Sequence, residues 1–113
     1  IPDMLAHAGG TVVYIGATRS VKGYAKSSGF APGKFALRAL AQCNASEFGP
    51  QGIHVFHVII DGRIDSVPLG ESGEVKSGML DARSIARVVA QVVAQPRDTW
   101  MHEFDIRPAV EAF

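Results

Sequence analysis

Apolar residues are concentrated in three short runs along the chain. The runs are TVVYI at 11–15, HVFHVII at 54–60 and WMHEFDI at 100–106, and they are rich in β-branched and aromatic residues. This composition predicts β-strands. The first two runs are nearly continuous in apolar residues, so we expect them to be covered on both faces, as the strands of a parallel sheet are.

Two longer segments carry apolar residues at helical spacing. The segment 30–48 has Pro32 in its first turn and is followed by Gly49-Pro50, which predicts a helix over these residues. A second helix is predicted over 82–95, with Asp81 as its N-cap. The apolar stripe of the first helix is expected at Phe30, Leu37, Leu40, Ala41, Asn44 and Phe48, with Cys43 beside it as a small packing residue, and that of the second at Ile85, Val88, Val89, Val92 and Val93.

The order of these elements is β–α–β–α–β, which predicts an α/β protein with a parallel sheet and right-handed crossovers. Residues 1–8 are expected to be the end of another helix, closed by Gly9-Gly10. Loops are expected at 16–29 and 63–79, and the second is long enough to indicate a mobile binding segment. Three strands leave an open sheet edge and the first methionine is Met4, so we expect residues 1–113 to be a single domain that is part of a larger one.

The composition narrows the class of partner. Basic and acidic residues are balanced at 11 each without a basic stripe, so a nucleic-acid partner is not expected. No apolar run approaches the roughly 20 residues that cross a bilayer, so no membrane partner is expected either. Cys43 is the single cysteine, which suits a reducing, cytoplasmic compartment. His54 and His57 are three apart on a strand and should face opposite sides, so no metal site is predicted.

Phe30 and Lys34 form the pair that is chemically most informative. Residues four apart on a helix lie on one face. A tyrosine at the first position would have its pKa lowered by the ammonium group, and it could exchange a proton with a carbonyl oxygen while hydride moves to or from a nicotinamide. Phe30 fills the same space but has no proton to give.

Two stretches resemble the C-terminal half of a short-chain dehydrogenase/reductase. They are GGTVVYIGATRS at 9–20 and GFAPGKFALRALAQCNASEFGPQGIHVFHVIIDGRIDS at 29–66. In that family a strand with a catalytic serine at its end precedes a Tyr-x-x-x-Lys helix, and a strand with a Pro-Gly turn and a threonine follows. The resemblance implies a partial Rossmann-like, doubly wound parallel sheet, the C-terminal half of a larger three-layer domain whose dinucleotide-binding half is absent from this sequence.

The resemblance also implies roles for single residues. Phe30 stands in the place of the catalytic tyrosine, and Lys34 in that of the lysine that binds the nicotinamide ribose. The serine falls at Ala17 or Thr18, and only Thr18 carries a hydroxyl. Cofactor contacts are implied for Lys34, for Asp61 and Gly62 in place of the Pro-Gly turn, for the backbone of Ile64, and for Ser66 in place of the threonine.

By this resemblance the cofactor is NAD or NADP and the substrate is a small carbonyl compound or alcohol. The helix at 30–48 often packs against its copy in this family, which implies a homodimer or tetramer. Another proton donor, such as Thr18 or water, would be needed. Phe30 and Lys34 should line a crevice at the ends of side-by-side strands. The alternative function is a non-catalytic scaffold or oligomerisation module that retains the fold.

Three further motifs carry less weight. YIGATRSVKG at 14–23 imitates the glycine-rich dinucleotide turn, but Ser20 and Lys22 replace its later glycines, so we interpret it as a decoy. Tyr24 would replace the missing phenol only in a rearranged loop. AKSSG at 25–29 approximates the nucleophile elbow of a hydrolase around Ser27, but a loop precedes it where the elbow needs a strand.

Overall fold

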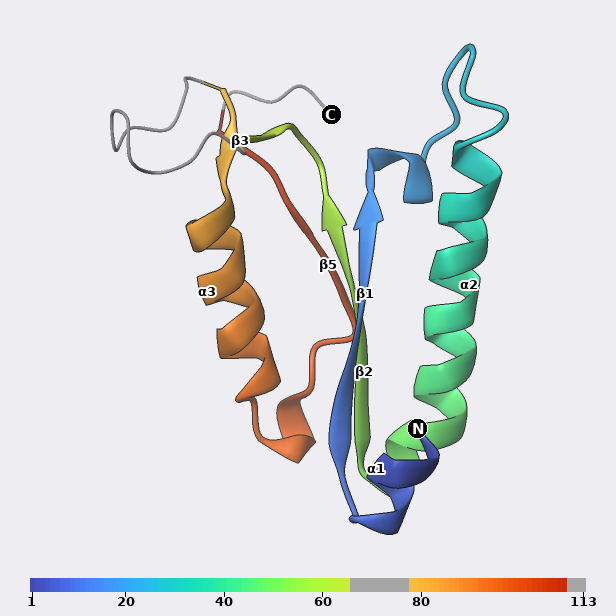
Figure 1. Cartoon of the computed structure of the whole chain (residues 1–113), viewed down its shortest axis with the longest axis vertical. Coiled ribbons are helices and arrows are strands. Elements are labelled where there is room, and N and C mark those ends of the chain that lie inside the picture. Colours follow the sequence, from blue (N-terminus) through green and yellow to red (C-terminus); the bar gives the residue numbers. More distant parts are fainter. Residues whose placement is uncertain (66–77, 110–113) are drawn as a thin grey trace.

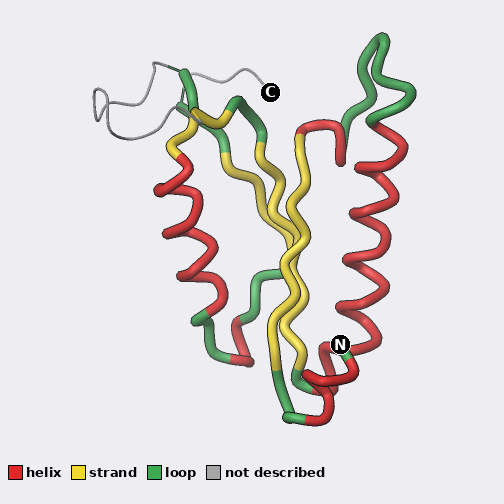
Figure 2. Tube along the Cα trace, viewed as in Figure 1, coloured by secondary structure: helices red, strands yellow, loops and turns green. Residues whose placement is uncertain are grey.

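A computed structural model of the chain describes residues 1–65 and 78–109. Within these residues a three-stranded sheet lies between two helices, so the fold has three layers (Figure 1). β2 (Ile53–Ile60) is the central strand, and β1 (Gly10–Ala17) and β5 (Glu103–Ile106) pair with it in parallel. Figure 2 shows the strands running side by side between the helices. The predicted α/β class and parallel sheet are confirmed.

The burial of each strand follows its place in the sheet. All residues of β2 are buried, so the expected coverage of both faces is confirmed for this strand. β1 is an edge strand of the described sheet, and most of its residues are only half-buried, with Ile15 51% exposed. The same expectation is therefore wrong for β1, because an edge strand keeps part of its apolar surface accessible. β5 begins three residues later than the predicted strand.

α2 (Ala31–Phe48) covers one face of the sheet, and its predicted bounds are confirmed to within one residue. Its buried residues are the small Ala31 and Ala41. Leu40 is 48% exposed and Cys43 is exposed as well. The predicted apolar stripe is therefore wrong at Leu40, and so is the packing role of Cys43. Small alanines, and not the largest apolar side chains, form the most buried part of this helix.

α3 (Ala82–Val93) covers the other face and ends two residues earlier than predicted. The Asp81 carboxylate accepts a hydrogen bond from Arg83 N at 3.0 Å, so the predicted N-cap is confirmed. This backbone hydrogen bond holds the pKa of Asp81 below its usual value. Ile85 of α3 packs against a buried apolar cluster of Val58, Ile60 and Leu80, as do the partly buried Val13, Phe104 and Ile106.

Several short elements complete the described chain. They are α1 (Pro2–Ala6), η1 (Thr18–Ser20), η2 (Gly49–Gln51), η3 (Arg97–Thr99), β3 (Ile64–Asp65) and β4 (Leu80–Asp81). β3 pairs in parallel with β4, so the loop predicted at 63–79 contains a two-residue strand at 64–65, and residues 66–77 lie outside the described part of the chain. After α1 the left-handed residue is Ala8, with a φ of 62°, and not Gly9 or Gly10 as predicted. No described helix has the length and apolar character needed to cross a bilayer.

The two long helices lie on opposite faces of the sheet (Figure 1). Asn44 of α2 donates a hydrogen bond to Tyr14 Oη, whereas Ile85 of α3 packs against the cluster of Val58, Ile60 and Leu80. The strand order β1-β2-β5 advances in one direction. Two parallel crossovers that advance the same way but place their helices on opposite faces must have opposite hands. The expectation of right-handed crossovers is therefore wrong for one of the two connections.

Candidate active site

A cavity of about 290 Å³ lies where β1 and β2 end. The two strands are paired as far as Ala17 and Ile60, so the residues that follow them emerge side by side. The carboxyl ends of parallel strands are where open α/β sheets bind ligands. The cavity is lined by Thr18, Arg19, Gly62, Arg63 and Gly78.

Thr18 and Asp61 form the polar centre of this region. Thr18 Oγ1 donates a hydrogen bond to Asp61 Oδ1 at 2.5 Å. Asp61 is only 2% exposed, and its backbone N–H donates to Ile106 O at 2.8 Å. Arg107 Nε lies 3.5 Å from the other carboxylate oxygen, Asp61 Oδ2, and forms an ion pair with it. Oδ2 accepts no hydrogen bond from the described residues. The hydroxyl–carboxylate pair is thus held by the ends of all three strands.

Phe30 and Lys34 lie one turn apart at the start of α2, as predicted. Lys34 Nζ lies 5.6 Å from the centroid of the Phe30 ring and donates a hydrogen bond to Ile15 O at 3.3 Å. Phe30 is 50% exposed. Neither residue is among those that line the cavity at the strand ends. The structure therefore brings Thr18 and Gly62 together at the cavity, and it places Lys34 beside β1 before that strand ends. The expectation that Phe30 and Lys34 line the crevice at the strand ends is wrong for this cavity.

Gly62 and Ile64, which are also predicted to contact a cofactor, differ in their position relative to the cavity. Gly62 lines the cavity, and a Cβ on it would lie 3.0 Å from Pro108 Cδ, so a side chain fits poorly there. Ile64 belongs to β3, is 42% exposed and is not among the lining residues. Ser66 lies outside the residues that the structure describes.

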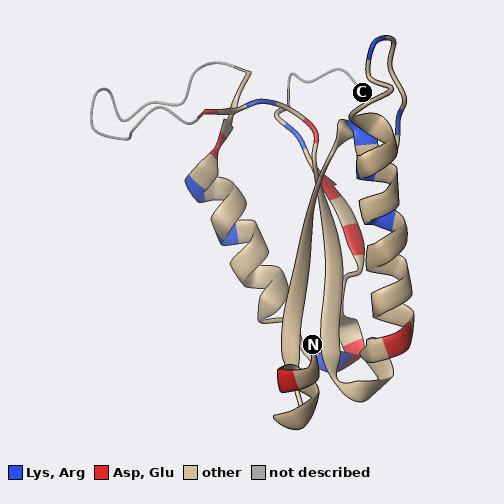
Figure 3. Cartoon of the chain, turned by 45° about the vertical axis from the view of Figure 1, so that its right-hand side comes forward, with Lys and Arg blue, Asp and Glu red and all other residues tan. Residues whose placement is uncertain are grey.

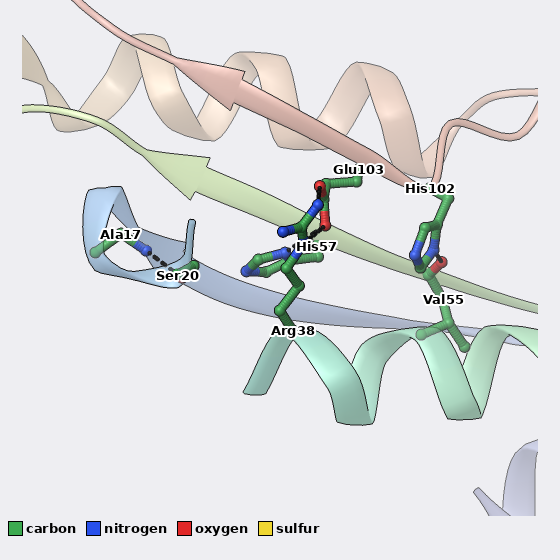
Figure 4. Close-up of polar contacts among 7 residues, drawn as sticks. All are labelled: Ala17, Ser20, Arg38, Val55, His57, His102 and Glu103. Atoms are coloured by element: carbon green, nitrogen blue, oxygen red, sulfur yellow. Dashed lines mark hydrogen bonds and ion pairs between the residues drawn. The ribbon is translucent and has the colours of Figure 1, made fainter. Parts of the chain in front are cut away.

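A partly buried polar network joins α2 to the sheet, and the sequence patterns did not predict it. Arg38 of α2 donates two hydrogen bonds, each 2.9 Å long, to the two carboxylate oxygens of Glu103 on β5. His57 Nδ1 on β2 lies 3.1 Å from Glu103 Oε2. Figure 4 shows Arg38 reaching from the helix to Glu103, with the His57 ring beside them. Burial raises the pKa of Glu103, but the hydrogen bonds from Arg38 and His57 lower it more, so it lies below its usual value.

His57 also connects this network to the end of β1. Its side chain is fully buried, and Nε2 has no hydrogen-bond partner in the described part of the chain. A Cβ on Gly16 would lie 2.1 Å from His57 Nε2 and 2.6 Å from Ser20 Oγ, so no larger residue fits at this position without rearrangement. Ser20 Oγ accepts a hydrogen bond from Ala17 N at 3.0 Å. The network therefore packs directly against the strand end that carries Thr18.

The structure also describes the three sequence motifs that carry less weight, which are Ser27 with its neighbours, Tyr24 and the segment 14–23. Ser27 Oγ donates a hydrogen bond to Tyr24 O and accepts one from Tyr24 N, which closes a turn, and no strand directly precedes it as a nucleophile elbow requires. The Tyr24 ring lies 4.7 Å from the Arg19 guanidinium and is not among the residues lining the cavity. β1 leads into the three-residue η1 and not into a helix, so the decoy interpretation of 14–23 is confirmed.

The histidines of β2 point to opposite faces, as predicted. The His54 ring stacks on Trp100 with 4.6 Å between centroids, whereas His57 faces Glu103. Within residues 1–65 and 78–109, no three His, Cys, Asp or Glu side chains gather in a way that would hold a metal ion.

The described residues fit the nicotinamide end of a dinucleotide. Lys34 makes one solvent-exposed hydrogen bond, to Ile15 O, and an ammonium group has three donors, so it can also bind ribose hydroxyls. Three residues of extended chain, about 10 Å, separate Ile15 from Thr18. Lys34 would hold the ribose of a nicotinamide cofactor, which would accept or supply hydride. A glycine-rich turn that opens a helix and would bind a pyrophosphate is not found in the part of the chain described here.

Solved structures of dehydrogenases are similar to this chain. A short-chain dehydrogenase from Rhodopseudomonas palustris is 36% identical with a TM-score of 0.72, over 93% of this chain and 41% of its own. Serine dehydrogenase from Escherichia coli is 15% identical with a TM-score of 0.80, over 99% of this chain and 46% of its own. An alcohol dehydrogenase from Thermococcus sibiricus complexed with 5-hydroxy-NADP is 22% identical with a TM-score of 0.78, over 98% of this chain and 47% of its own. No protein-family model and no curated protein matches the sequence.

The chain thus spans a little under half the length of these enzymes. Over that length it has their fold, an α/β structure with three parallel strands and helices on both faces. We conclude that the chain matches about half of a Rossmann-type short-chain dehydrogenase/reductase and resembles the oxidoreductases of that family.

Proposed function

We propose that this chain is the substrate-facing half of a NAD(P)-dependent oxidoreductase of the short-chain dehydrogenase/reductase type, which interconverts an alcohol and a carbonyl compound. The observation that carries this proposal is the hydrogen bond from Thr18 to Asp61 beside a cavity at the carboxyl ends of β1 and β2. The position is where parallel sheets bind ligands, and a hydroxyl paired with a carboxylate can move a proton. The resemblance to dehydrogenases supports the same reaction class.

The Thr18–Asp61 pair would carry out the proton transfer that the phenyl ring of Phe30 cannot perform. In the oxidation direction the substrate hydroxyl gives its proton to Thr18 Oγ1, and Thr18 gives its own proton to Asp61 Oδ1. In the reduction direction both protons move back, so the carbonyl oxygen becomes a hydroxyl. When bound, a nicotinamide accepts or supplies the hydride that balances each direction. Phe30 then serves as an apolar surface beside Lys34.

Lys34 provides the test of cofactor binding. We expect Lys34→Met to weaken the binding of NADH or NADPH by the full-length protein about tenfold, because a charge-assisted hydrogen bond to the ribose is lost. Isothermal titration calorimetry with both cofactors measures this change. Lys26→Met is the matched control, since Lys26 lies in the preceding loop and lines a different cavity. Failure of the unmodified protein to bind either cofactor would contradict the proposed oxidoreductase.

A second function, self-association through α2, is favoured by the apolar side chains that this helix exposes. Phe35 is 41% and Leu40 48% exposed, and Cys43 is exposed on the same helix. Exposed apolar residues gathered on one helix are typical of an interaction surface. We therefore propose a homodimer or tetramer that packs through α2. This assembly suits the enzyme and equally a non-catalytic scaffold, and cofactor binding separates the two.

Leu40→Glu is expected to shift the protein toward the monomer, because a carboxylate cannot be buried unpaired in the contact. Sedimentation velocity over a range of protein concentrations measures the shift. Val93→Glu is the matched control, since Val93 is 44% exposed on α3. An unchanged distribution of species in Leu40→Glu, or an equal change in both variants, would rule out the α2 contact.

A further inference from the structure

Two guanidinium groups beside the candidate active site differ from every other arginine in the chain. Arg19 and Arg63 line the cavity that also contains Thr18. Neither side chain forms a hydrogen bond or an ion pair with another described residue, and the Arg19 guanidinium makes a cation–π contact with the Tyr24 ring. The five remaining arginines each donate to an oxygen of a described residue; they are Arg38, Arg83, Arg87, Arg97 and Arg107.

Each arginine has one contact that restrains it, at the side chain of Arg19 and at the backbone of Arg63. The Arg19 guanidinium lies 4.7 Å from the centroid of the Tyr24 ring, a cation–π contact that leaves its N–H donors available. The backbone of Arg63 is held by a hydrogen bond of 2.7 Å from Leu80 N to Arg63 O, and Leu80 is a buried core residue. Two cationic groups with unused donors therefore border one small cavity.

The charge around the cavity favours an anion. The nearest buried carboxylate, Asp61, is already engaged by Thr18 and Arg107, so it does not neutralise the two arginines. Figure 3 shows that most basic segments of the chain lie on the helices and loops toward the end where β1 and β2 finish, with acidic segments among them. A guanidinium offers a planar fork of donors that matches a carboxylate with two hydrogen bonds.

We propose that the substrate is a small carbonyl or hydroxyl compound that bears a carboxylate, and that Arg19 and Arg63 bind this carboxylate. This inference rests on the proposed function, because it assigns the substrate class of the same site. The cavity of about 290 Å³ is at the small end of the range for ligand sites. Arg19, Arg63 and Thr18 line the same small cavity. The bound anion is therefore a carboxylate of the substrate, whose reacting oxygen contacts Thr18, and not a phosphate of the cofactor.

The test compares acetoacetate with methyl acetoacetate, which has the same carbonyl but no charge. We expect kcat/KM with NADPH to be at least about tenfold higher for the acid in the unmodified full-length protein, and NMR titration to show tighter binding of the acid at the amides of Thr18 and Gly62. Arg63→Gln and Arg19→Gln should each remove most of this preference, because they lower kcat/KM for the acid much more than for the ester. Arg87→Gln, on α3, is the control that should keep it.

The outcomes separate this inference from the proposed function. Equal binding and turnover of the two probes, or a preference that survives both arginine variants, overturns the carboxylate inference while reduction of the ester upholds the oxidoreductase. Acid binding that depends on both arginines, without turnover or cofactor binding, supports the carboxylate site and contradicts the oxidoreductase. Failure of the unmodified protein to bind acetoacetate, or arginine variants that weaken NADPH binding and not acid binding, also overturns the inference.

Discussion

Replacing Thr18 with valine is expected to lower kcat for carbonyl reduction about 100-fold, which is the low end of the contribution of a positioned acid–base group. Valine keeps the shape of the side chain but removes the hydroxyl that would pass a proton between the substrate oxygen and Asp61. Thr18 Oγ1 lies 2.5 Å from Asp61 Oδ1, which is within hydrogen-bond reach for this proton transfer. Thr18→Ser keeps the hydroxyl and should retain most of the activity. Steady-state rates with NADPH and methyl acetoacetate measure both variants.

Two further variants make this result interpretable. Thr99→Val is the matched control, because Thr99 Oγ1 donates to Pro96 O in η3, at the exposed surface. Phe30→Tyr tests the competing explanation that the site lacks nothing except a phenol beside Lys34. A large gain in Phe30→Tyr, together with unchanged activity in Thr18→Val, would contradict the role of the Thr18–Asp61 pair. Absence of activity in every variant would favour the scaffold.

Features that depend on neighbours in the sequence were predictable. The bounds of α2 and the Asp81 cap of α3 follow from proline, glycine and cap residues within a few positions of each other. The continuous apolar run of β2 likewise predicts a fully buried strand, since such a run requires cover on both faces. The side of α2 that is buried was less predictable, because the small Ala31 and Ala41 are buried while the larger Leu40 is exposed.

Features that join distant segments were not predictable in the same way. Thr18 and Asp61 were both candidates by resemblance, but their hydrogen bond spans 43 residues and depends on the register of β1 against β2. The pair of Arg38 and Glu103 spans 65 residues. Arg38 follows the pattern of an ordinary solvent-facing helix charge. One signal was available for Glu103, since a charged residue inside an apolar strand run is buried only if it is paired.

The network of Arg38, His57 and Glu103 gives the second large expected effect. Glu103→Gln should lower the free energy of unfolding at pH 7 by about 2 kcal/mol, because the isosteric amide cannot hold both hydrogen bonds from Arg38 or pair with charge. The expected loss is below that of a fully buried pair, since the side chains of Arg38 and Glu103 are 35% and 22% exposed. Urea unfolding measures it, and Glu47→Gln on the exposed side of α2 should change stability by less than about 0.5 kcal/mol.

The unmodified protein and Glu103→Gln should differ in their free energy of unfolding by an amount that depends on pH, which would identify an electrostatic origin. Burial raises the pKa of Glu103, but the hydrogen bonds from Arg38 and His57 lower it more, so the folded protein holds this pKa below the ordinary value of 4.5. The carboxylate therefore contributes its full stabilisation above the pKa of the unfolded chain and loses it as the pH falls through the lower folded pKa. Unfolding curves of the unmodified protein and Glu103→Gln should be furthest apart at pH 7 and converge in acid. A difference that stays constant from pH 7 into acid would show that the amide disturbs packing alone, and that the ion pair does not stabilise the contact between α2 and the sheet.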